Sequence, residues 1–315
     1  MDISVVIPVY GCPEAVDPLC DRLTKTLTSI VSSYEVILVN DGCPKGSWSE
    51  IKKAVNKYQN IKGINLSRNF GQIHATNAGI NVTSGDYVVL MDCDLQDKPE
   101  GIVDLYNEIK KGKDIVFVKR KNRKDNPITI FFSKMFYRVY NHFVDGYYDA
   151  DISNFSIATR KIVDEYKKIG DNNKTYITML CWMGYNSSII EIVGEERYEG
   201  KSSYNFSKKI NLAIDMITSQ SNKPLKTMIK IGLSIVFLSF VYIAYKIILY
   251  FITKDVPEGW TSMIASVFMM GGVTLICLGV VGIYVGNIFT QTKNVPEYFI
   301  DEIIEGEIND KNITK

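Results

Sequence analysis

Residues 87–94 read Tyr87-Val88-Val89-Leu90-Met91-Asp92-Cys93-Asp94, a short apolar run that ends in two carboxylates one residue apart. Because side chains alternate along an extended segment, Asp92 and Asp94 share one face where the predicted strand ends. Paired carboxylates in the open crevice at the carboxyl end of a strand suit a hard divalent cation that also binds a diphosphate. The alternative is a turn whose aspartates only cap the next helix.

The segments around this stretch alternate between strand and helix patterns. The predicted strands are 3–9, 34–40, 61–66, 86–91 and 114–118, and the predicted helices are 14–31, 48–58 and 72–81. Such alternation predicts a parallel α/β sheet, whose ligands lie outside the carboxyl ends of the strands. Polar residues also follow the first two strands, as Pro8-Val9-Tyr10-Gly11 and Asn40-Asp41-Gly42. Their repetition at matching strand ends favours a pocket over an ordinary turn.

Two further polar segments are candidates for binding anions. Pro99 is expected at the start of a helix. After it, the predicted strand 114–118 is followed by the basic run 119–124. This run is either a solvated turn or a loop in which Arg120 faces a phosphate. Residues 196–204 combine cations, hydroxyls and a glycine, which suits a mobile anion-binding loop.

The bulk composition bounds the class of protein. With 315 residues and 46% hydrophobic content, the chain can hold one large or two modest domains. A net charge of +1 argues against a nucleic-acid-binding protein that neutralises many phosphates. The two histidines, His74 and His142, are expected in structural roles. Because none of the cysteines forms a C-x-x-C pair, all six are predicted to be free thiols in a reducing compartment: Cys12, Cys20, Cys43, Cys93, Cys181 and Cys277.

The C-terminal third predicts a transmembrane hairpin, at about 229–252 and 260–290. From Ile231 to Ile252 the only charge is Lys246, and from Trp260 to Thr290 there is none, so both segments exceed the roughly 20 residues needed to cross a bilayer. Four lysines flank the two ends of the hairpin, whereas its loop carries only Lys254. Because lysines are enriched on the cytoplasmic side, this bias places both ends in the cytoplasm. The four flanking lysines are Lys223, Lys226, Lys230 and Lys293. The N-terminus has no signal-peptide pattern, so we expect residues 1–204 on the cytoplasmic side of the inner membrane.

Amphipathic segments precede the hairpin. Residues 205–228 are predicted as a juxtamembrane interfacial helix, whereas the aromatic stripe of 128–144 fits either a core or the membrane surface. In the second span, Gly282-x-x-x-Gly286 allows close helix approach, either to the first span or to another copy. The tail, 291–315, is expected to be cytoplasmic, with its acidic part from Asp301 to Asp310 as solvated surface.

Taken together, these segments resemble family 2 glycosyltransferases of the polyprenyl-phosphate type, the group of bactoprenol glucosyltransferases and dolichol-phosphate mannose synthase. The resemblance covers nearly the whole chain and rests on 5–10, 39–42, 66–71, 91–97, Arg197-x-x-Gly200-x-Ser202 and the terminal hairpin. It implies a GT-A (Rossmann-like) domain over 1–204, followed by the interfacial helix and the hairpin.

The resemblance also implies roles for individual residues. Nucleotide binding falls to Pro8, Tyr10, Asp41, Arg68, Asp92 and Gln96. Asp92 and Asp94 would hold Mg²⁺ or Mn²⁺ on the donor diphosphate and would be catalytic together with Arg197. The phosphates of donor and acceptor would meet Arg120, Ser133, Arg197 and Ser202. One departure matters, because family members often carry an Asp where this chain has Asn154, and an amide cannot act as a general base.

The resemblance implies a membrane-anchored, inverting enzyme that moves one sugar from a nucleotide diphosphate, expected to be a UDP-sugar, to undecaprenyl phosphate for modification of cell-envelope glycans. It also suggests a homo-oligomer at the lipid bilayer. A processive polysaccharide synthase is disfavoured because no Q-x-x-R-W motif occurs and two spans are few for a pore. A non-catalytic nucleotide-sugar-binding scaffold is the remaining alternative, against which the retained D-x-D, Arg197 and Ser202 argue.

Overall fold

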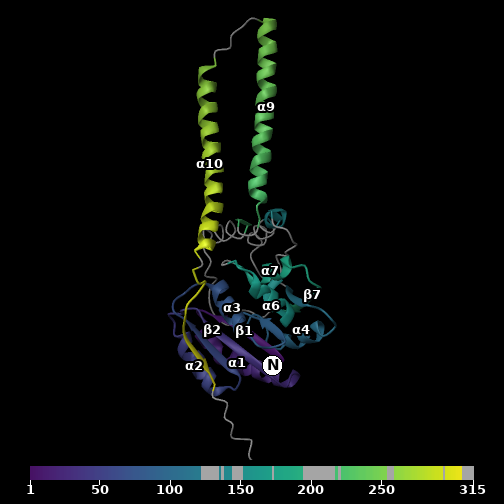
Figure 1. Ribbon diagram of the computed structural model, residues 1–315. Coiled ribbons are helices and arrows are strands. Elements are labelled where there is room, and N and C mark those ends of the chain that lie inside the picture. Colours follow the sequence, from purple (N-terminus) through teal and green to yellow (C-terminus); the bar gives the residue numbers. More distant parts are fainter. Residues whose placement is uncertain are drawn as a thin grey trace, which may run out of the picture. The chain divides into compact units, whose positions relative to one another are not determined.

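The computed structural model describes residues 1–121, 135, 138–143, 152–171, 174–193, 217–218, 221–253, 259–293 and 295–306. The chain divides into two compact units (Figure 1). The first comprises Met1–Arg138, Gly146–Tyr204 and Pro296–Lys315, and the second comprises Val139–Asp145 and Asn205–Val295. The first unit therefore contains sequence from both sides of the second.

The first unit is built on one eight-stranded sheet with the order β7-β5-β6-β4-β1-β2-β3-β8. Its strands are β1 (Ile3–Val9), β2 (Tyr34–Asn40), β3 (Ile61–Leu66), β4 (Tyr87–Leu90), β5 (Ile115–Lys121), β6 (Ile152–Thr159), β7 (Ser187–Val193) and β8 (Ile300–Glu305). Strands β4, β1, β2 and β3 pair in parallel, whereas β6 and β8 pair antiparallel to their neighbours. The predicted, mostly parallel α/β sheet is confirmed.

Helices cover both faces of this sheet. They are α1 (Pro13–Ile30), α2 (Ser47–Lys57), α3 (Gln72–Asn81), α4 (Gly101–Ile109), α6 (Arg160–Lys168) and α7 (Tyr176–Trp182). Alternate residues of β1 pack into two hydrophobic cores on opposite faces of the sheet. Val5 and Ile7 belong to the core with α1, α2 and α4, and Val6 belongs to the core with α3, α6 and α7. Burial on both faces explains the continuous apolar runs of β1 and β2.

The acidic C-terminal segment departs from expectation. The segment from Asp301 to Asp310 was predicted to be solvated surface, but Ile300–Glu305 form β8, which pairs antiparallel with β3, with Ile304 opposite Gly63. A Cβ at Gly63 would lie 2.8 Å from Ile304 Cγ1, so the glycine makes room for this isoleucine. Trp48 Nε1 donates to Glu302 Oε2 at 3.1 Å. The acidic residues suit an edge strand, because charges discourage further strand pairing, and the apolar residues between them supply the packing.

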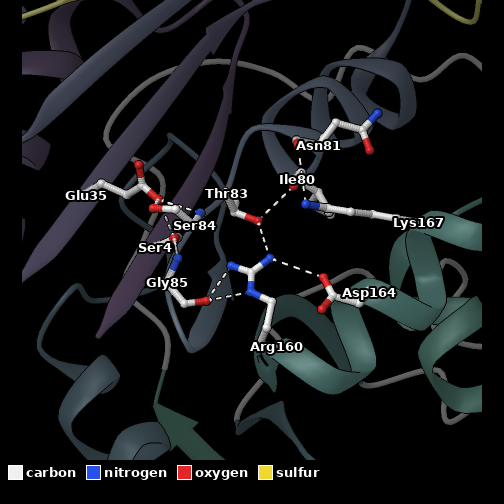
Figure 2. A network of polar contacts seen from close by, with 10 residues as sticks. All are labelled: Ser4, Glu35, Ile80, Asn81, Thr83, Ser84, Gly85, Arg160, Asp164 and Lys167. Carbon is white, nitrogen blue, oxygen red and sulfur yellow. Dashed lines mark hydrogen bonds and ion pairs between the residues drawn. The ribbon is translucent and has the colours of Figure 1, made fainter. Parts of the chain in front are cut away.

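A polar network joins the amino ends of β1, β2 and β4 (Figure 2). Glu35 is 1% exposed, and its Oε1 accepts hydrogen bonds from Ser4 Oγ at 2.6 Å, Ser84 N at 2.8 Å and Ser84 Oγ at 2.7 Å. Arg160, the first residue of α6, donates to the Gly85 carbonyl and to Thr83 Oγ1. The network thus holds these strands together at their amino ends, opposite the end of the sheet where the parallel strands have their carboxyl ends.

The second unit contains two long helices, α9 (Lys223–Thr253) and α10 (Trp260–Thr292), each long and apolar enough to cross a membrane. Tyr284 Oη donates to the Ser221 carbonyl at 2.7 Å, which ties α10 to the segment before α9. A Cβ at Gly282 or Gly286 would meet no heavy atom of the described residues within 4 Å, so the structure shows no packing of α9 on these glycines. Most of the predicted interfacial helix and of 128–144 lies outside the described residues, and 138–143 are helical.

Candidate functional site

The register of the parallel strands brings three polar loops to one edge of the sheet. Val9 pairs with Asn40 in the β1–β2 ladder, and Val6 pairs with Leu90 in the β1–β4 ladder. The loops that begin at Tyr10, Asp41 and Met91 therefore leave neighbouring strands at the same edge. The side chain of Tyr10 is 48% exposed there. Such a position suits stacking on the base of a ligand.

Asp41 organises the loop after β3. It is 2% exposed, and its two carboxylate oxygens accept hydrogen bonds from Phe70 N at 2.7 Å and Gly71 N at 2.9 Å. Burial raises the pKa of Asp41, and these backbone hydrogen bonds act in the opposite direction. Gly42 has φ +58°, and a Cβ there would lie 2.4 Å from the Arg68 carbonyl carbon. Asp41 and Gly42 together hold residues 68–71 against the end of β2.

Asp92 is held by two amide groups from other elements. Its Oδ1 accepts hydrogen bonds from Gln72 Nε2 at 2.7 Å and Asn154 Nδ2 at 3.1 Å. Gln72 is the first residue of α3, and Asn154 lies in β6, which pairs with β4. Amide donors orient a carboxylate without adding a charge. The orientation of Asp92 is therefore set by one residue of α3 and one residue of β6.

Asp94 lies in a tight local turn. Its Oδ1 accepts a hydrogen bond from Gln96 N at 3.1 Å, and the intervening Leu95 has φ +58° while being 5% exposed. Positive φ is rare for a residue with a branched side chain and persists only where the surrounding structure enforces it. The geometry of the aspartate pair is thus set by packing of the loop.

The aspartate pair fits a metal that shares its ligands with substrate. Among the described residues, no group of three or more His, Cys, Asp and Glu side chains is arranged to hold a metal ion. Mg²⁺ is commonly bound by one or two carboxylates together with substrate phosphates and water. Asp92 and Asp94, both partly exposed, have the oxygen chemistry for such a site.

The prediction that all six cysteines are free is wrong. Cys12 and Cys93 form a disulfide with Cα atoms 6.8 Å apart, although 81 residues separate them in sequence. The sequence spacing does not reveal this pair, because the two cysteines are brought together only by the sheet. Each of them follows one of the adjacent parallel strands β1 and β4. The remaining cysteines, Cys20, Cys43, Cys181 and Cys277, are free.

The other predicted site residues are distributed as follows. Pro8 is buried in β1, Gln96 is partly exposed, and the exposed Arg68 stacks over the Phe70 ring, with Cζ 4.2 Å from its centroid. Arg120 lies in β5, while Ser133, Arg197 and Ser202 lie outside the described residues.

Sequence reasoning missed two contacts at this site. It did not single out Gln72, and it did not foresee that Asn154 binds Asp92. The signal for Gln72 was available, because Gln72 follows the loop after β3 and so lies at the same strand edge.

Comparison with known proteins identifies the family of the chain. The profile described as Glycosyl transferase family 2 matches residues 4–167. A glycosyltransferase of Synechocystis sp. is 34% identical over 306 residues, covering 96% of each chain. The bactoprenol glucosyl transferase of Shigella phage SfX is 32% identical over 302 residues, covering 95% of this chain and 99% of the phage protein. The crystal structure of S. aureus TarS 1-349 in complex with UDP-GlcNAc shares the fold, with TM-score 0.50 and 19% identity over 70% of this chain and 66% of that one.

Proposed function

The chain belongs to glycosyltransferase family 2, and on this premise we propose that it transfers one sugar from a nucleotide diphosphate donor, expected to be a UDP-sugar, to undecaprenyl phosphate. The phage relatives named bactoprenol glucosyl transferase support a polyprenyl-phosphate acceptor, because the similarity to them extends over nearly the whole of both chains. The UDP-GlcNAc complex of TarS, a protein of the same fold, is compatible with a UDP donor.

The observation that carries the proposal is the convergence of Tyr10, Asp41 and the Asp92–Asp94 pair at one sheet edge. The exposed ring of Tyr10 would stack on the nucleotide base. Asp41 would act mainly by holding the 68–71 segment, since both its oxygens already accept backbone hydrogen bonds. Asp92 and Asp94 would hold Mg²⁺ or Mn²⁺, which when bound neutralises charge on the donor diphosphate.

The acceptor needs no general base from this chain. A phosphate monoester has a second pKa of about 6 and is already largely anionic at neutral pH, so its oxygen can attack the anomeric carbon directly and invert it. Asn154 would keep Asp92 oriented through its 3.1 Å hydrogen bond. The protein's part is to position the two substrates and stabilise the leaving diphosphate, and we assign Arg120, Ser133, Arg197 and Ser202 to the phosphates of donor and acceptor.

We place the catalytic unit on the cytoplasmic side of the inner membrane, with α9 and α10 as two spans. The lysines Lys223, Lys226 and Lys230 at the amino end of α9 and Lys293 after α10 support this orientation. The sheet supplies an independent argument. The chain leaves the first unit before α9 and returns after α10 as β8, paired with β3, which supports placing both ends of the hairpin on the same side of the bilayer.

The test is transfer of radiolabelled sugar from a panel of nucleotide sugars to undecaprenyl phosphate in liposomes, with and without EDTA. We expect one donor to label the organic-solvent extract, and only when metal is present. Bound nucleotide without labelled lipid would refute the proposed acceptor and favour a non-catalytic binder, and long water-soluble products would indicate a processive synthase.

A pair of variants separates the metal site from general damage. Asp94→Asn should lose at least 100-fold in turnover, in line with the loss of a major electrostatic contributor, while folding and inserting normally. The matched control is Asp21→Asn on α1, which removes an exposed carboxylate whose partner is Lys25, 2.6 Å away. Near-normal turnover in Asp94→Asn would remove the metal assignment.

A further inference from the structure

The Cys12–Cys93 disulfide joins two loops of the proposed donor site. Cys12 immediately precedes α1, two residues after the exposed Tyr10, and Cys93 separates Asp92 from Asp94. The bond therefore joins the loop proposed to hold the nucleotide base to the motif proposed to hold the metal. Each of the two cysteines is 8% exposed, and both belong to the hydrophobic core that includes residues of α1, α2 and α4.

The segment around Cys93 needs such a restraint. Leu95 keeps φ +58° in a buried position, and Asp94 Oδ1 bonds Gln96 N at 3.1 Å to close the turn. A residue in this backbone region stays there only when its surroundings over-determine it. The disulfide fixes the chain two residues before Leu95, and without it the aspartate pair can relax toward unstrained backbone.

A third sulfur lies beside the same loop. Gly11 N donates a hydrogen bond to Cys43 Sγ at 3.2 Å, so Cys43 contacts the residue next to Cys12. Burial would raise the pKa of the Cys43 thiol, but hydrogen bonds from Ser47, Gly11 and Lys45 outweigh it and leave the pKa below its ordinary value. By contrast, burial raises the pKa of Cys20 and that of Cys181 to about 12. Of these three free thiols, the one with the lowered pKa lies beside the Cys12 loop.

We propose that Cys12 and Cys93 form a reversible thiol–disulfide modification site that sets the affinity of the donor site for the metal–nucleotide complex. The proposal rests on the proposed function of Asp92 and Asp94 and on the cytoplasmic placement, where disulfides are rare and those that form are usually catalytic or redox-sensing. The bridged state is the state of high affinity, and the dithiol state binds more weakly.

The oxidant is a low-molecular-weight disulfide. The Cys12 thiolate attacks one of its sulfurs, forming a mixed disulfide and releasing one thiolate. The Cys93 thiolate then attacks the Cys12 sulfur, which forms the bridge and releases the second thiolate. The two protein thiols give up two electrons to the small disulfide, and their two protons go to the released thiolates. A small dithiol reverses the reaction.

The experiment measures UDP binding with Mn²⁺ to the full-length protein in detergent, after oxidation with glutathione disulfide and after reduction with dithiothreitol. Peptide mapping under non-reducing conditions identifies the bridged pair. We expect a 12–93 bridge and a loss of about fivefold to thirtyfold in affinity on reduction, the range that one strained residue released from its fixed conformation can give. Reoxidation should restore the affinity.

Matched variants make the result specific. Cys181→Ser, outside the site, should respond to redox state like the unmodified protein, whereas Cys12→Ser should stay at the reduced affinity under both conditions. Equal affinity in both states, a Cys12–Cys43 bridge, or a redox response that persists in Cys12→Ser would overturn the proposal while leaving the proposed function intact. Absence of UDP binding in either state would refute the proposed nucleotide site, and the redox proposal with it.

Discussion

Replacing Glu35 by Gln tests how the sheet that carries the site is held together. The carboxylate accepts three hydrogen bonds from Ser4 and Ser84, and its second oxygen lies 3.3 Å from Lys62 Nζ. Glutamine keeps the shape but not the charge. A hydrogen bond to a charged group contributes about 1 kcal/mol more than a neutral one, so three bonds lose about 3 kcal/mol. Because the neutral amide is also easier to bury, we expect a net loss of about 2 kcal/mol.

The pH dependence of this loss has a definite sign. Burial alone would raise the pKa of Glu35, but the hydrogen bonds from Ser4 and Ser84 and the charge of Lys62 outweigh it, so the pKa lies below its ordinary value. A carboxyl with a lowered folded-state pKa stabilises the protein fully above its ordinary pKa of about 4.3, and this contribution disappears as the pH falls through the folded-state pKa. The difference between the two proteins should therefore be full at pH 7 and shrink below pH ~4.

The assay is thermal unfolding of the full-length protein in detergent, followed by the fluorescence of Trp48 and Trp182 in the first unit. A loss of about 2 kcal/mol corresponds to a fall in Tm of roughly 4–8 °C for a domain of this size class. The control is Asp164→Asn in the same network (Figure 2), where the 3.6 Å ion pair with Arg160 involves a carboxylate that is 52% exposed. If the two variants lower Tm equally at pH 7, or if the effect of Glu35→Gln does not shrink as the pH is lowered below about 4, the reasoning is wrong.

Three further predictions concern the site and the returning strand. Gly42→Ala should weaken UDP binding by at least tenfold, because the new Cβ would lie 2.4 Å from the Arg68 backbone. The control is Gly112→Ala, at a glycine that also has positive φ but has no heavy atom within 4 Å of the added Cβ. This variant should bind UDP normally in the same titration. Glu297→Gln should lower Tm by about 2–4 °C, since Asn77 donates to this carboxylate at 2.8 Å and His74 and Lys174 face it; an unchanged Tm would contradict that role. Ending the chain at residue 295 removes β8 and exposes the β3 edge, so we expect aggregation, measured by size-exclusion chromatography; a monodisperse, active product would show that β8 is dispensable.

The sequence predicts the first five strands of the sheet well because their pattern is local, whereas β6, β7 and β8 were not predicted as strands. Strand β1 fills 3–9 and strand β2 fills 34–40, as expected, since strands buried on both faces are continuous apolar runs between turn residues. The helix expected to begin at Pro99 begins instead at Gly101, because the carbonyls of Lys98 and Pro99 accept bonds from Gly101 N and Ile102 N and form a turn first.

What the sequence did not predict depends on contacts between distant residues. The disulfide joins residues 81 positions apart, and β8 pairs with a strand more than 230 residues earlier. The acidic residues of β8 indicated a solvated tail because the sequence did not show that β3 would be their partner strand. Similarly, Asn154 could be recognised as a departure from the family, but its 3.1 Å hydrogen bond to Asp92 depends on β6 lying beside β4.

The contact between Asn154 and Asp92 changes the meaning of that departure. A carboxylate at position 154 would lie about 3 Å from a second carboxylate and repel it unless a cation lay between them. An amide instead donates to Asp92, as Gln72 also does, so the aspartate is oriented before any ligand arrives. Compared with an aspartate, it also lowers by one the negative charge that the proposed acceptor phosphate would approach. If the acceptor is the phosphate proposed above, its oxygen is already ionised, so orientation of Asp92 and reduced repulsion would be of more use than a second base, and Asn154 would supply both.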